Sequence, residues 1–232
     1  MPTAIASKRI FEPRQQRSRE TLARVLDAFV ELLEKKPFEQ ITMAELARRS
    51  KIAVTSIYAR FEDKRALVLA AHERHRDEMI GEIDRILDPA QWRGAALETI
   101  VRETMTRIIA DRRSRLPLLR AALLVNDRDV YERAAQISRH ASERMTALLA
   151  PYLIWLPEPE RGRTVDFALR AATSVLQQRL VFGDIEPGRF HLSESEWNQR
   201  LADQFLATLT YGRSPTAKPH WPAKLKTVRA KK

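Results

Sequence analysis

The chain has 232 residues, six glycines, no cysteine and a formal net charge of +11. The lack of cysteine excludes a disulfide framework and thiolate chemistry, and long segments rich in Ala, Leu, Arg and Glu indicate an all-α fold. No run of eighteen apolar residues occurs and the N-terminus lacks the apolar core of a signal peptide, so we expect a cytoplasmic protein without a membrane partner.

Most of the excess positive charge lies at the two ends of the chain. Residues 1–20 contain five basic and two acidic residues, residues 213–232 contain seven basic residues and no acidic one, and the segment between them holds 29 and 28. We therefore expect a flexible basic arm over residues 1–16 and a basic C-terminal tail over residues 213–232. Such ends can bind polyphosphate, and the alternative for the tail is a purely solubilising role.

The first helix is predicted over residues 18–36. Its apolar residues recur at helical spacing and form one buried face: Leu22, Val25, Leu26, Phe29 and Leu33. Pro37 ends the helix, because helices usually stop before the residue that precedes a proline. Phe38 is then expected to fill the small core between this helix and the next two.

Residues 41–64 are predicted to form two short helices joined by a tight turn. Thr42 and Glu45 match the capping box, so the first of these helices begins directly after Thr42. Ile41 and Leu46 stand at the spacing of a hydrophobic staple, which fixes the direction in which the chain enters the helix.

The second of these helices is predicted over residues 54–61, after a turn at residues 50–52. It buries Ile57 and Phe61, which are four residues apart. Its solvent side carries small or hydroxyl-bearing side chains and one guanidinium, namely Thr55, Ser56, Tyr58, Ala59 and Arg60. A slim helix with hydrogen-bonding groups suits the DNA major groove, so the pair fits a helix-turn-helix.

This segment resembles the DNA-binding domain of the TetR family of bacterial transcriptional repressors. The matching positions are Ile41-Thr42, Leu46-Ala47, Ile57-Tyr58, Phe61, Lys64 and Ala66-Leu67. The resemblance implies a three-helix head with a helix-turn-helix over residues 17–75, and a larger helical-bundle domain for ligand binding and dimerisation over residues 76–212. It also implies a DNA-binding set made of Thr42, Val54, Thr55, Ser56, Tyr58, Ala59, Arg60 and Lys64.

Within that set, the resemblance implies two kinds of contact with DNA. Thr42, Tyr58 and Lys64 would hold phosphates, with Arg60 as a further candidate. The base edges would be faced by Thr55, Ser56 and Ala59. Lys64 follows Asp63, a good N-cap, and would lie in the first turn of the next helix, where backbone amides favour an anion.

Two residues depart from the family pattern. Lys51 stands where the family usually has glycine, and a left-handed backbone there costs about 1–2 kcal/mol for a non-glycine residue. Ala53 stands where Ser or Thr usually caps the recognition helix, a loss of about 1 kcal/mol. The helix therefore begins either after Ala53 or one to two residues later, with Thr55 as its cap.

The remainder of the chain reads as a series of helices. Asp63 begins a helix that runs towards Leu87, and Asp88-Pro89 breaks it. The charged stretch 112–115 is predicted to be a turn. A capping box, Ser193 with Glu196, begins the last helix. The helices predicted between these points span residues 95–111, 116–125, 127–153 (capped by Asp127 or Asp129), 160–181 and 194–211.

The last two helices, about 160–181 and 194–211, are apolar on much of their circumference. Two such helices expose more apolar surface than one bundle covers, so we expect them to form a homodimer with the same pair of a second copy. The alternative is that both helices are ordinary core.

The ligand and metal predictions rest on weaker patterns. Five residues near apolar helices are candidates for a small-molecule site: Trp92, Met105, Tyr131, His140 and Trp155. His72 and His75 have a spacing that can chelate a metal, but no further ligands complete the set, and we interpret them as exposed histidines of a charged helix. We therefore expect no metal and no cofactor.

The resemblance implies a DNA-binding transcriptional regulator, a repressor released from a palindromic double-stranded operator by an unknown small-molecule inducer. The alternatives are an activator of the same fold and a non-specific, nucleoid-type DNA-binding protein. No Gly-rich phosphate loop, cysteine nucleophile or metal constellation occurs, so we do not expect an enzyme.

Overall fold

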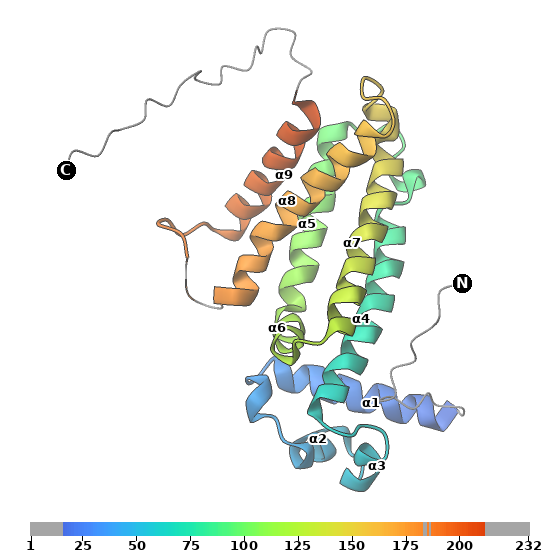
Figure 1. Cartoon of the computed structure of the whole chain (residues 1–232), viewed down its shortest axis with the longest axis vertical. Coiled ribbons are helices and arrows are strands. Elements are labelled where there is room, and N and C mark those ends of the chain that lie inside the picture. Colours follow the sequence, from blue (N-terminus) through green and yellow to red (C-terminus); the bar gives the residue numbers. More distant parts are fainter. Residues whose placement is uncertain (1–15, 183–184, 186, 212–232) are drawn as a thin grey trace, which may run out of the picture.

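The structure, a computed structural model, describes residues 16–182, 185 and 187–211. The predicted basic arm and basic tail therefore lie almost wholly outside the described residues. Every regular element within them is helical (Figure 1), and the α-helices are α1 (Gln16–Leu33), α2 (Met43–Ser50), α3 (Val54–Tyr58), α4 (Lys64–Ile86), α5 (Leu97–Ser114), α6 (Leu116–Val125), α7 (Arg128–Leu149), α8 (Glu160–Phe182) and α9 (Glu194–Thr210). Short 3₁₀ helices lie at Phe38–Gln40 (η1), Pro89–Trp92 (η2) and Ala150–Tyr152 (η3).

The helices form a small head and a larger body, as the sequence predicted. Figure 1 shows α1 lying across the lower end of the molecule, with α2 and α3 beneath it. The long α4 starts in the head and runs up beside α7 into the body, which α5, α7, α8 and α9 complete. The predicted all-α architecture of two parts is confirmed.

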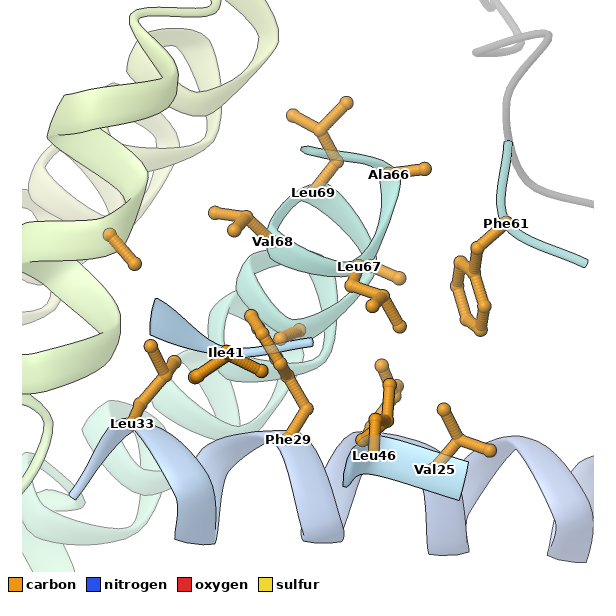
Figure 2. Packing of buried hydrophobic residues seen from close by; sticks show 14 of the residues in the cluster. Val25, Phe29, Leu33, Ile41, Leu46, Phe61, Ala66, Leu67, Val68 and Leu69 are labelled. Atoms are coloured by element: carbon orange, nitrogen blue, oxygen red, sulfur yellow. The ribbon is translucent and has the colours of Figure 1, made fainter. Parts of the chain in front are cut away.

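The head has a continuous apolar core. The stripe predicted for the first helix is buried or half-buried, and Phe29 is fully buried. Phe38 packs edge-on against Phe29, with ring centroids 6.4 Å apart. Ile41 and Leu46, the predicted staple pair, both belong to this core (Figure 2). These apolar contacts fix α2 and α3 against α1 and α4.

A second core holds the body together. Its fully buried large side chains come from several helices, namely Ile100 and Met105 of α5, Met145 and Leu149 of α7, and Phe205 of α9. The two clusters meet around α4, whose first half packs in the head and whose second half packs in the body.

The short helix α6 links the two parts. By sequence it lies in the body, but Leu118, Ala121, Ala122 and Val125 belong to the core of the head. It packs against α1 and α4 on one side and against α8 on the other. The boundary predicted between residues 75 and 76 therefore separates segments of sequence, but the head's core crosses it.

Several helix ends differ from the predictions. The helix that was predicted to reach residue 36 ends at Leu33, followed by two turn bonds to the Leu32 carbonyl. The predicted charged turn at 112–115 is mostly helical, because α5 continues to Ser114. The helix predicted to reach residue 153 ends at Leu149 and is followed by η3.

Candidate nucleic-acid interface

The helix-turn-helix begins with Thr42, the N-cap of α2. Its Oγ1 accepts a hydrogen bond of 3.2 Å from the backbone N–H of Glu45. The Glu45 carboxylate forms an ion pair with Lys36. Hydrogen bonds from the Lys36 side chain and from the Thr42 backbone lower the pKa of Glu45. The predicted cap is confirmed, and it also fastens α2 to the turn after α1.

The turn of the motif contains a left-handed lysine. Lys51 has φ 58° and ψ 37°, the left-handed conformation that the sequence left open for this position. The Ile52 N–H donates to the Ala47 carbonyl at 3.1 Å, and Arg24 of α1 donates to the Ser50 carbonyl at 2.7 Å. Since a left-handed non-glycine residue costs about 1–2 kcal/mol, these bonds offset strain that a glycine would avoid.

The recognition helix, α3, begins at Val54 with Ala53 as its N-cap. No side-chain oxygen caps it, and the Ala53 carbonyl accepts from Ser56 at 2.9 Å and from Ile57 at 3.2 Å. The hypothesis that Thr55 caps a shifted helix is wrong, because Thr55 lies within the first turn. The helix therefore keeps the start expected from the family pattern, without the side-chain cap.

The two sides of α3 are sharply different. Ile57 is fully buried and so is Phe61 just beyond the helix, as predicted. The other side is open to solvent, with Tyr58 53% exposed. That side carries five exposed residues of the predicted DNA-binding set: Val54, Thr55, Ser56, Tyr58 and Ala59. No described part of the chain covers this face, so a groove of DNA can reach it.

The two basic residues of the predicted set make contacts within the head. Arg60 donates to Ser18 Oγ at 2.9 Å, which joins the end of the motif to α1. The Lys64 ammonium lies 5.0 Å from the centroid of the Phe38 ring. It donates to three backbone carbonyls, those of Ile41 (2.9 Å), Glu39 (3.1 Å) and Phe38 (3.4 Å). A phosphate contact by Lys64, which stays a prediction, requires it to release at least one of these carbonyls.

Residues 25–71 match the family described as bacterial regulatory proteins, tetR family. This stretch runs from α1 into α4 and contains the cap, the left-handed turn and the exposed face of α3. Residues 25–71 form a TetR-family head. The TetR-family head is that of a DNA-binding transcriptional regulator. No curated protein matches the whole sequence significantly.

Solved structures share this TetR-family fold over both parts of the chain. A protein from Mesorhizobium loti MAFF303099 assigned to the TetR-family regulators has a TM-score of 0.67 at 15% identity, covering 84% of this chain and 98% of its own. A transcriptional regulator from Cytophaga hutchinsonii ATCC 33406 has a TM-score of 0.64 at 15% identity, covering 82% and 96%. A tetR-family regulator from Streptomyces coelicolor has a TM-score of 0.63 at 19% identity, covering 82% and 80%. At these identities the likeness establishes the fold alone.

None of the five ligand candidates lines the cavity that the described residues form between α5, α6, α8 and α9. Trp92 and Met105 are core, and the Trp92 indole donates to the Ile86 carbonyl at 2.7 Å. Tyr131 donates to Asn126 at 2.8 Å on the surface. His140 lies 2.9 Å from Asp84 Oδ1, and Trp155 packs at the edge of the body core. Ligand binding by these five residues stays a prediction.

His72 and His75 are buried, so their interpretation as exposed histidines was wrong. They are 1% and 5% exposed, with ring centroids 5.9 Å apart. Burial lowers the pKa of each to about 4, helped by Arg133 at His72 and by Arg115 at His75. Both are therefore neutral at neutral pH. No group of three or more His, Asp or Glu side chains able to hold a metal occurs among the described residues.

The body does contain a cavity, which the sequence did not reveal. It has a volume of about 320 Å³ and lies where α5, α6, α8 and the start of α9 meet. Arg112, Arg113, Leu116, Val175 and Trp197 are among the residues that line it. No pattern within one segment predicts this cavity, because these residues come from four helices and Arg112 stood in a predicted turn. None of the described helices is long and apolar enough to cross a membrane.

Proposed function

We propose that the protein is a homodimeric repressor that binds a near-palindromic operator and is released from it by a small-molecule inducer. The observation that carries this proposal is the exposed, hydroxyl-bearing face of α3 on a head that matches the TetR family. An activator differs from a repressor by where its operator lies relative to the promoter, and the same geometry serves both.

The exposed face of α3 has the composition that groove reading requires. Thr55, Ser56 and Ala59 are short, so the helix can approach base edges closely. Tyr58 extends further and offers one hydroxyl, which suits a phosphate at the rim of the groove. Two such helices, one from each subunit, would enter successive major grooves about 34–36 Å apart.

The dimer proposal rests on α8 more than on α9. The apolar stripe of α9 is covered by its own body, since Leu201, Phe205 and Leu209 are all buried. On α8, Phe167 is 65% exposed and lies over a shallow surface depression shared with the end of α9, where Tyr211 is also exposed. Pairing this face with a second copy would remove both aromatic side chains from water.

The proposed inducer effect has a physical route through α6. Leu116 and Leu119 of this helix line the body cavity, whereas Leu118 and Ala122 lie in the core of the head. A ligand that fits only one position of α6 would therefore favour one position of the head. It would release DNA only if it binds that arrangement more tightly than the DNA-bound one.

Selection of bound fragments from genomic DNA tests the DNA-reading proposal directly. We expect an enriched motif with two-fold symmetry, whose half-sites are one helical turn apart or a multiple of it. A nucleoid-type binder would instead enrich no motif and would show similar affinity for all duplexes. Transcription from a promoter that carries the motif, measured with and without the protein, separates repression from activation.

Sedimentation of the purified chain tests the dimer. Phe167→Asp places a charge in the proposed interface, so we expect it to convert the dimer to monomer. Leu124→Asp is the matched control, since Leu124 is 61% exposed on α6 and lies outside the α8–α9 face. A native chain that is monomeric at micromolar concentration would refute this part of the proposal.

A further inference from the structure

The wall of the body cavity includes one arginine, Arg112, that forms no ion pair with a described residue. Arg112 and Arg113 of α5 both line it. Arg113 forms an ion pair with Glu194 at the start of α9, which also lines the cavity, so these two charges cancel. Arg112 forms no ion pair with any described residue. Its neighbour Asp111 attracts the Arg112 guanidinium electrostatically, but the Asp111 carboxylate lies at ion-pair distance from Arg115, at 3.9 Å.

Arg112 is also poorly placed to be compensated by water. Its side chain is half-buried, and burial lowers the pKa of its guanidinium. Removing a cation from water without a paired anion is unfavourable, and a guanidinium can accept a carboxylate through two parallel hydrogen bonds. His191, the remaining titratable residue of the lining, can only add positive charge.

The rest of the lining is apolar. Ile109 of α5, Leu116 of α6 and Leu176 of α8 belong to it, as does the Trp197 ring of α9. The cavity's volume of about 320 Å³ is at the small end of the range for ligand sites, roughly 300–1,000 Å³. It therefore offers an apolar chamber for a compact ligand, with one unpaired positive group at its wall.

We propose that this cavity binds a small apolar molecule that carries one anionic group, such as a carboxylate, with Arg112 as the residue that binds the anion. The inference deepens the proposed function, on which it rests, because it gives the chemical class of the inducer. Arg113 does not compete for the anion while it pairs with Glu194. The apolar part of the ligand would lie against α6, the helix that reaches into the head.

The position of Arg112 also connects the ligand's charge to the helix that enters the head. Arg112 is close enough to lower the pKa of His75 in α4, after the larger effects of burial, Arg115 and His72. An anion bound at Arg112 would reduce the positive potential around α4. The ligand would thus act on α4 by its charge and on α6 by its shape.

Calorimetry with three probes of one chain length tests the proposal on the full chain without DNA. The probes are decanoate, 1-decanol and decylamine, each below its micellar concentration. We expect decanoate to bind at least about ten-fold more tightly than decanol, as a hydrogen bond to a charged group permits, and decylamine to bind most weakly. Equal affinities for decanoate and decanol would overturn the proposal.

Substitutions in the cavity then test which residue binds the anionic group. Arg112→Met should make the affinities for decanoate and decanol about equal, while the affinity for decanol stays unchanged. Arg112→Lys should restore part of the preference for decanoate. Arg120→Met is the control, since Arg120 is an exposed arginine on α6 that does not line the cavity. Leu176→Trp, which fills the chamber, should abolish binding of all three probes. A preference that survives Arg112→Met, or binding that survives Leu176→Trp, would place the ligand elsewhere.

The ligand-binding measurements and the operator selection test the two proposals independently. A chain that binds decanoate as described but enriches no DNA motif would refute the regulator proposal and leave the cavity assignment intact. A chain that enriches an operator but binds all three probes alike would keep the regulator and refute the anion site. Circular dichroism of each variant shows that it is folded before its affinity is compared.

Discussion

Arg65 Nη2 donates a hydrogen bond of 2.8 Å to the backbone carbonyl of Val125. Arg65 lies in the second position of α4, just after the DNA-reading motif, and Val125 is the last residue of α6. The bond therefore joins the head to α6, a body helix that contributes to the head's core. A cation at the C-terminal end of a helix is also favoured by the helix dipole.

Replacing Arg65 should loosen this connection. We expect Arg65→Met to lower the free energy of unfolding by about 1 kcal/mol, because Arg65 is exposed and its charged hydrogen bond is partly screened. Urea denaturation measures the change, with Arg120→Met as the control for loss of an exposed arginine. A loss no greater than that of the control would show that the bond does not stabilise the junction.

Replacing Lys51 in the left-handed turn by glycine should raise the free energy of unfolding, whereas replacing Arg65 should lower it. Lys51→Gly removes strain of about 1–2 kcal/mol but gives the unfolded chain more freedom, so we expect a net gain of about 0.5–1 kcal/mol in unfolding free energy. Asn126, with φ 50°, provides a comparison, because asparagine tolerates this conformation and Asn126→Gly should gain less. Lys51→Ala keeps the strain and should not stabilise.

Local signals account for the part of the structure that could be predicted. The Thr42 cap and the buried pair Ile57 and Phe61 each follow from residues within a few positions of one another, whereas the backbone conformation of Lys51 was left open. The spacing of these positions is also what the TetR family shares. The outline of the head was therefore readable before any contact between distant segments was known.

The features that were not predicted depend on distant residues. His72 and His75 stand among charged neighbours in the sequence, yet helices α6 and α7 pack over α4 and bury them. Lys64 was expected to hold a phosphate, and the sequence did not show that η1 and the residue after it bring three carbonyls to its ammonium. The cavity arises only where four helices meet. The periodicity of apolar residues predicts which face of a helix is buried, but it does not predict which other segment packs against that face.

The buried histidines predict a pH dependence of stability. Their pKa values, about 4 in the folded protein, lie below the ordinary 6.5, so the unfolded chain binds more protons between these values. Stability should therefore be full above pH 6.5 and should fall as the pH drops towards 4, by at most about 3 kcal/mol for each histidine. The mutual effect of the two rings makes the losses non-additive.

Unfolding free energies measured from pH 7.5 to pH 4 check this dependence. His72→Leu with His75→Leu should flatten the slope between pH 6.5 and pH 4, because no proton is then taken up at these sites on unfolding. Replacing the exposed His191 by Gln should leave this slope nearly unchanged. A slope that persists in the double variant would assign acid sensitivity to the carboxylates instead.

Tyr58 tests how the recognition helix meets DNA. Tyr58→Phe removes only the hydroxyl of a residue that is 53% exposed, so the fold should be unaffected. We expect affinity for the operator and for unrelated duplexes to fall alike, by about ten-fold, since a phosphate contact carries no sequence information. Tyr131→Phe, on the body surface, is the control. Unchanged affinity would refute the phosphate role.

One substitution of Lys64 tests its role in the fold and its predicted contact with a DNA phosphate. Lys64→Met removes one donor from three backbone carbonyls, of which that of Phe38 still accepts from the Ile41 N–H, so we expect a loss of about 1–3 kcal/mol in unfolding free energy. If Lys64 also holds a phosphate, the salt dependence of DNA binding should weaken by about 0.9 in slope for each subunit.

The two readouts separate these uses because the structural bonds exist without DNA. Lower stability together with an unchanged salt slope would limit Lys64 to fastening η1 onto α4. Lys36→Met provides the comparison, since Lys36 also lies in the head but pairs with Glu45 and belongs to no predicted DNA contact. It should lower stability without altering the salt slope.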